Sequence, residues 1–72
     1  MEKLDLHGVR HHEVDLMVEN FIFLNQNEVP LNITCGSSSR MVELVQKVLD
    51  RNGSDYIVGK GLDFGRITLL KL

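Results

Sequence analysis

Apolar and polar residues alternate in three stretches of this chain, over residues 4–7, 30–34 and 67–72, and residues 56–58 form a short apolar run. Alternation with a period of two is typical of β-strands that have one face on a core and the other facing water. Pro30 cannot donate a hydrogen bond to a neighbouring strand, so it marks the start of the second stretch. The pattern predicts four strands, and the last, which is the most apolar, belongs inside the sheet.

Between these strands, apolar residues recur with the spacing of amphipathic helices, over about residues 11–24 and 39–52. Ser38 or Ser39 suits the N-cap of the second helix, whereas Arg10 stands where a capping Ser or Thr is expected before the first. The two apolar stripes consist of Val14, Met17, Val18, Phe21 and Ile22, and of Met41, Leu44, Val45, Val48 and Leu49.

The predicted order of elements is βαβαββ, which indicates one α+β domain of the α/β class over residues 1–72. Two strands joined by a helix are expected to be parallel with a right-handed crossover, and the last two strands are close enough for a hairpin. We therefore expect a two-layer sandwich, with a mixed four-stranded sheet in the order first, second, fourth, third and both helices on one face. The predicted core consists of Leu4, Leu6, Val14, Val18, Phe21, Ile33, Val45, Leu49, Ile67 and Leu69.

The first strand places Asp5 and His7 on the open face of this sheet, with Leu4 and Leu6 on the opposite face. Their side chains are expected about 7 Å apart along the strand, and Gly8 then allows the backbone to turn. A carboxylate and an imidazole at the C-terminal end of a strand form a candidate catalytic pair. The alternative is that they face water, or fix the strand-to-helix turn by hydrogen bonds to the backbone.

Composition narrows the functional classes. The chain has 72 residues, of which 43% are hydrophobic and 25% charged, as expected of a small globular domain. The formal net charge is -2, so a nucleic-acid partner would be held by a local cluster, for which Arg10, Lys60 and Arg66 are candidates, or a larger partner would supply the affinity. One cysteine, no signal-peptide pattern and no apolar run of membrane-spanning length predict a cytoplasmic protein without a membrane partner.

Three segments resemble a known protein family. Residues 4–8 (LDLHG), followed by Glu13 early in a helix, resemble the opening motif of Smr (small MutS-related) domains. Residues 33–41 (ITCGSSSRM) occupy the place of the second Smr motif, a strand ending in His-Gly or Thr-Gly before a glycine-rich turn and a helix with an early Arg or Lys. Residues 65–72 (GRITLLKL) are similar to the closing glycine and apolar strand of the family.

The resemblance implies a fold similar to the C-terminal domain of bacterial translation initiation factor three. It also implies an endonuclease or nicking activity on DNA or RNA, with Asp5 and His7 as the catalytic residues and Gly36 as the first glycine of the turn. The chain departs from the family at two positions. Cys35, which the alternation points into the core, replaces the His or Thr before Gly36, and Ser38 replaces the second glycine.

Each residue of the implied site has a chemical role. For RNA, His7 would act as the general base for a 2′-hydroxyl, with Asp5 orienting the imidazole. DNA has no internal nucleophile, so its cleavage would need an activated water and a divalent metal such as Mg²⁺ or Mn²⁺, held in part by Asp5. His11 and His12 lack a ligand spacing with His7, so no protein-built metal site is predicted. The expected phosphate-binding residues are Gly8, Gly36, Ser37, Ser38 and Arg40.

Leu16 and Phe23 lie seven residues apart, on a side of the first helix nearly opposite its apolar stripe. They are either ordinary surface residues or the contact for a protein partner or a second copy of the chain. Three functions therefore stay open: an Smr-type endonuclease, a non-catalytic nucleic-acid binder, and a protein-interaction module associated with repair or with ribosomes.

Overall fold

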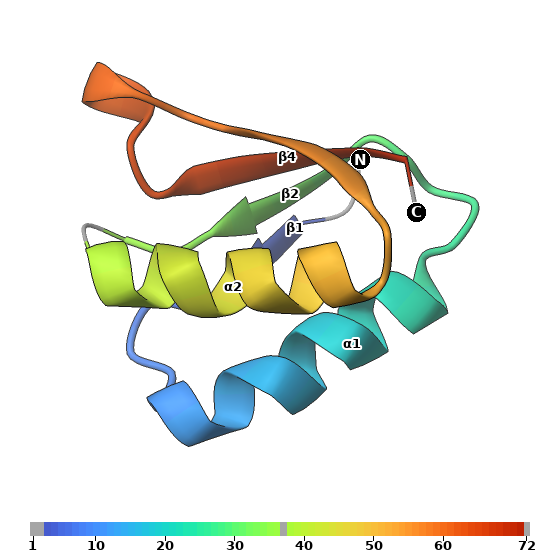
Figure 1. Cartoon of the computed structure of the whole chain (residues 1–72), viewed down its shortest axis with the longest axis horizontal. Helices are drawn as coiled ribbons and strands as arrows, with labels where there is room; N and C mark the ends of the chain where they lie inside the picture. Colours follow the sequence, from blue (N-terminus) through green and yellow to red (C-terminus); the bar gives the residue numbers. More distant parts are fainter. Residues whose placement is uncertain (1–2, 37, 72) are drawn as a thin grey trace.

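The computed structural model describes residues 3–36 and 38–71 and confirms the predicted order of strands and helices (Figure 1). Two short 3₁₀ helices, η1 and η2, add to the predicted elements; η1 forms the first turn of the predicted 11–24 helix, and η2 lies before the last strand. The elements are β1 (Lys3–Asp5), η1 (His11–Glu13), α1 (Val14–Leu24), β2 (Leu31–Thr34), α2 (Ser39–Arg51), β3 (Asp55–Val58), η2 (Gly61–Asp63) and β4 (Arg66–Lys71).

The sheet has the predicted strand order, β1-β2-β4-β3. β1 and β2 are parallel, with Leu4 opposite Ile33, whereas β4 is antiparallel to both β2 and β3. β4 is an interior strand, and its alternating Ile67 and Leu69 are fully buried. The apolar composition of the last strand and the lengths of the connections were therefore sufficient to predict the order of the four strands.

Both helices cover the same face of the sheet, so the molecule is a two-layer sandwich, as predicted (Figure 1). Leu4 and Phe21 are half-buried at the margin of the core, and the other eight residues of the predicted core are buried. The buried apolar residues are Leu6, Val14, Val18, Ile22, Leu31, Ile33, Cys35, Met41, Val42, Val45, Val48, Leu49, Ile67 and Leu69.

The two helices begin differently. The Ser38 hydroxyl accepts a hydrogen bond from the Met41 N–H at 3.1 Å, which caps α2 as expected. Arg10 precedes η1 and makes no side-chain cap, so the chain enters α1 through a 3₁₀ turn. The predicted first helix thus begins at the expected residue but becomes α-helical only at Val14.

The face of the sheet away from the helices is open. It is mostly polar, with the exposed apolar residues Ile57 and Leu70 among the polar ones. Asp5 lies opposite Thr34 on β2, and Thr34 lies opposite Arg66 on β4. The alternation that buries Leu31 and Ile33 leaves Thr34 half-exposed and Arg66 exposed. Within the described ranges, no helix is long and apolar enough to cross a membrane.

Candidate functional site

The predicted site residues meet at one end of the sheet, because the parallel strands β1 and β2 both finish there. β4 runs antiparallel to β2 and therefore starts at the same end, and α2 begins just after β2. We call this end the His7 edge and define it by Asp5, His7, Gly36, Ser38 and Gly65. Figure 1 shows the blue segment after β1, the first turn of α2 and the start of β4 at this end of the molecule.

Asp5 and His7 are both exposed, as predicted, but the strand is shorter than expected and ends at Asp5. The Asp5 Oδ1 atom accepts a hydrogen bond from the backbone N–H of His7 at 2.9 Å. Because this bond spans two residues, it closes an Asx-type turn. The carboxylate thus holds the His7 backbone, which corresponds to the alternative role considered for this pair.

The chain beyond β1 stays attached to β2 for one more residue. The Leu6 N–H donates to the Thr34 carbonyl at 2.8 Å, and the Leu6 side chain is fully buried. The Val9 N–H then donates to the Leu6 carbonyl at 3.0 Å, and Gly8 between them has a φ of 82°. His7 therefore lies in a short turn that backbone hydrogen bonds hold on both sides.

Three segments of the chain are in contact beside His7: the turn after β1, the end of β2 and the residue before β4. A Cβ atom added to Gly36 would lie 3.6 Å from the Cδ2 atom of His7, so the imidazole lies beside this glycine. The Cys35 N–H donates to the Gly65 carbonyl at 2.5 Å. A Cβ atom on Gly65 would lie 1.8 Å from the Gly36 carbonyl oxygen, which leaves no room for a side chain. The structure thus brings His7 and Gly36 together and adds Gly65 as a supporting residue.

Gly65 was absent from the predicted site residues, although the sequence contains a signal for it. A glycine directly before the most apolar strand indicates a close approach between backbones. Which backbone it approaches depends on the pairing of β2 with β4, and local periodicity does not encode that pairing.

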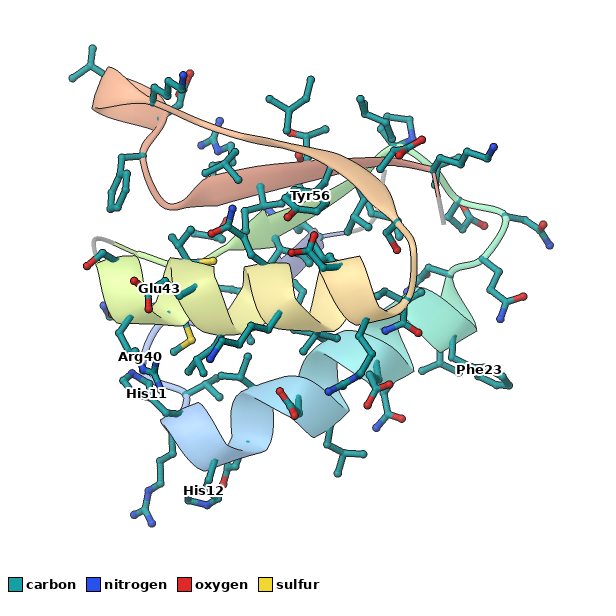
Figure 2. The ribbon with its side chains drawn as sticks, viewed as in Figure 1. His11, His12, Phe23, Arg40, Glu43 and Tyr56 are labelled. Atoms are coloured by element: carbon teal, nitrogen blue, oxygen red, sulfur yellow. The ribbon has the colours of Figure 1, made fainter. Side chains whose placement is uncertain are left out.

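The N-terminal end of α2 contributes exposed polar groups to the same edge. The hydroxyl of Ser38 is already used as the helix cap. Arg40 is exposed, and its guanidinium lies 3.4 Å from the Glu43 carboxylate. An exposed pair of this kind contributes little to stability, so the guanidinium is available to an anionic ligand. Figure 2 shows Arg40 and Glu43 on the first turns of α2; the predicted Ser37 lies outside the described residues.

The charges around the edge are mixed. Arg10, Lys60 and Arg66 are exposed, and so are the acidic Asp5 and Asp63. The edge therefore has separate cationic positions and no continuous basic patch.

Cys35 is buried below this surface, as the alternation predicted. Desolvation by burial raises the pKa of the Cys35 thiol from 9.0 to about 11. The thiol is therefore protonated at neutral pH and serves as a small apolar residue of the core.

His11 and His12 are exposed residues of η1. The Nε2 atom of His12 lies 3.9 Å from the Oε1 atom of Glu13, its neighbour in the chain. Across residues 3–36 and 38–71, no three His, Cys, Asp or Glu side chains are grouped so that they could share a metal ion.

Leu16 and Phe23 are strongly exposed, as predicted, with exposed fractions of 66% and 72%. A shallow pocket of about 400 Å³ lies beside them on α1. Phe23 lies at the opposite end of the molecule from Arg40 and His11 (Figure 2). This apolar surface is therefore separate from the His7 edge.

Comparisons of the chain with protein-family models, curated proteins and solved structures found no match. The resemblance to Smr domains accordingly rests on the motif residues, and the function that it implies is a proposal.

Proposed function

We propose that this chain is a nucleic-acid-binding domain of the Smr kind, which cleaves a phosphodiester bond at the His7 edge. The observation that carries the proposal is the position of the His7 imidazole. It is exposed, it lies beside Gly36, and it stands where β1 and β2 end and α2 begins. A base, a glycine and the N-terminal end of a helix thus lie at one edge of the molecule, and such groups suit phosphate chemistry.

RNA is the substrate that fits these groups best, because its 2′-hydroxyl is an internal nucleophile. Neutral His7 accepts the proton of the 2′-hydroxyl, and the 2′-oxygen attacks the adjacent phosphorus. The bond from phosphorus to the 5′-oxygen breaks, and this oxygen takes a proton from water. The products are a 2′,3′-cyclic phosphate and a 5′-hydroxyl end. The Arg40 guanidinium stabilises the negative charge on the phosphate as it develops.

Asp5 acts in this scheme as a positioning residue. Its Oδ1 atom holds the backbone of His7, which fixes the turn that presents the imidazole. The 2′-hydroxyl of RNA is an internal nucleophile, so this scheme needs no water activated by a metal ion. We therefore assign no step of the reaction to a bound metal ion.

Binding without cleavage is the second candidate, and a specific observation favours it. The Asp5 carboxylate is bonded to the backbone, while Cys35 is buried and Ser38 is used as a cap. Three positions of the two motifs thus have structural roles, which a non-catalytic domain with the same fold would also need.

Cleavage assays on end-labelled RNA and branched DNA, each with EDTA, Mg²⁺ or Mn²⁺, test the proposal. The variants are His7→Ala and, as a matched control, His12→Ala, an exposed histidine outside the edge. We expect RNA cleavage by the wild type and by His12→Ala, and none by His7→Ala. Tight binding without cleavage supports the second candidate, and the absence of both binding and cleavage contradicts the proposal.

A further inference from the structure

The connection between β3 and β4 extends the His7 edge beyond the end of the sheet. η2 lies in this connection, and Figure 1 shows it in orange, projecting past the start of β4. Gly65 at its end is packed against Gly36, which in turn lies beside His7. We call residues 60–64 the η2 loop; it stands next to the surface at which we propose that phosphate is held.

The η2 loop is closed by its own backbone. The Asp63 N–H donates to the Lys60 carbonyl at 3.1 Å, and the Phe64 N–H donates to the Gly61 carbonyl at 3.2 Å. At its base, the Gly59 N–H donates to the Arg66 carbonyl at 2.8 Å. A Cβ atom on Gly59 would lie 2.2 Å from the Asp63 carbonyl oxygen, so the two sides of the loop are in contact. The loop therefore presents its side chains in a preorganised arrangement.

Two of the side chains that it presents are apolar. Leu62 is fully exposed at the tip of the loop, and 45% of Phe64 is exposed. Lys60 precedes this pair and Arg66 follows it, and both are exposed, while Asp63 lies between the two apolar residues. An apolar tip flanked by two cations suits a ligand that offers flat apolar faces along an anionic backbone.

We propose that Leu62 and Phe64 contact unpaired bases of the nucleic acid, Phe64 by stacking and Leu62 as a wedge, while Lys60 and Arg66 contact the adjacent phosphates. The inference rests on the proposed function and adds to it a substrate class, RNA with unpaired bases beside the phosphate at the His7 edge. Aromatic side chains stack on bases irrespective of sequence, and apolar side chains are known to insert between base steps. In a duplex the faces of the bases are already stacked on one another.

A second exposed apolar surface, on α1, lacks this combination. Leu16 and Phe23 lie on α1 among the acidic residues Asp15 and Glu19, and both acids are paired with Arg51. These two acids and one cation leave the surface with one negative charge, which repels a phosphate backbone, whereas Lys60 and Arg66 outnumber Asp63 at the η2 loop. Leu16 and Phe23 therefore provide matched controls, since they are the same residue types on a remote face. Phe23 is more exposed than Phe64, and Leu16 is 66% exposed where Leu62 is fully exposed.

The test measures the binding of two probes, a single-stranded RNA with 2-aminopurine at its centre and the same RNA in a full duplex. The variants are Leu62→Ser and Phe64→Ser, and the controls are Leu16→Ser and Phe23→Ser. We expect each loop variant to bind the single strand about tenfold more weakly, with a smaller change in 2-aminopurine fluorescence. Duplex binding by the loop variants, and binding of both probes by the controls, should stay within about twofold of the wild type.

Phe64 is partly buried, so a second variant keeps the test independent of folding. The chain contains no tryptophan, and Leu62→Trp places a single reporter at the exposed tip. We expect single-stranded RNA to quench its fluorescence more strongly than duplex RNA does. Equal quenching by both RNAs, or unchanged affinity of Leu62→Ser, overturns the base contact, while binding by the wild type keeps the nucleic-acid binding on which the proposed function depends. Failure of the wild type to bind either RNA overturns both.

Discussion

Asp5 fixes its turn through an oxygen atom that an asparagine also possesses. Asp5→Asn keeps an acceptor for the His7 N–H, whereas Asp5→Ala removes it. We expect Asp5→Ala to lower the free energy of unfolding by about 1 kcal/mol, and Asp5→Asn by less than half of that. Urea denaturation of both variants measures the difference, and equal losses would mean that the carboxylate charge matters more than the hydrogen bond.

The contact between Gly65 and Gly36 leaves no space for a methyl group. Gly65 has a φ of 90°, and its added Cβ atom would lie 1.8 Å from the Gly36 carbonyl oxygen. Gly8 has a similar φ of 82° but nothing within 4 Å of an added Cβ atom. We expect Gly8→Ala to cost about 1 kcal/mol from backbone strain, and Gly65→Ala to cost about 3 kcal/mol or more. Similar costs in thermal denaturation would show that the close approach is absent.

The buried thiol of Cys35 makes the free energy of unfolding depend on pH in the alkaline range. Its pKa is raised from 9.0 to about 11 in the folded chain, so between these values the unfolded state releases a proton that the folded state retains. Folding stability due to Cys35 is therefore complete below pH 9 and falls as the pH rises towards 11. We expect the stability advantage of the wild type over Cys35→Ala to shrink between pH 8 and pH 10.5 in urea denaturation; a constant advantage would contradict the burial.

At the scale of the elements, α2 depends on a side-chain cap that α1 lacks. Ser38→Ala removes the acceptor for the Met41 N–H and should lower stability by about 1 kcal/mol. Ser39→Ala is the control, because Ser39 is the first residue of the helix and alanine is the better helix former there. Thermal unfolding of the two variants should rank Ser38→Ala well below Ser39→Ala, and the reverse order would place the cap at Ser39.

The elements themselves follow closely from the periodicity of the sequence. The stripe around Val45 and the alternation of Ile67 and Leu69 each bury one face, as the periods of the two patterns require. The early end of β1 was missed because Leu6 continues the alternation, although it extends the ladder by a single hydrogen bond. The absence of a capping Ser or Thr at Arg10 correctly indicated that the first helix begins without a side-chain cap.

At the scale of the whole molecule, the strand order is what assembles the candidate site. This order was predicted from the lengths of the connections and from the apolar composition of the last strand. It correctly placed the ends of β1 and β2 side by side. Sequence reasoning therefore predicted that His7 and Gly36 are neighbours. It missed the packing of Gly65 against Gly36, because that contact depends on the pairing of β2 with β4. The use of the Asp5 carboxylate by the backbone was one of the alternatives that the sequence left open, since the bond spans only two residues.

The central claim is that nucleic acid binds at the His7 edge, and an NMR titration tests it most directly. The uniformly ¹⁵N-labelled chain is titrated with a short single-stranded RNA, and amide shifts are mapped onto the structure. We predict the largest changes at His7, Gly8, Gly36 and Gly65, with α1 residues such as Leu16 unchanged. Changes confined to the outer face of α1, or no changes at all, would contradict the claim.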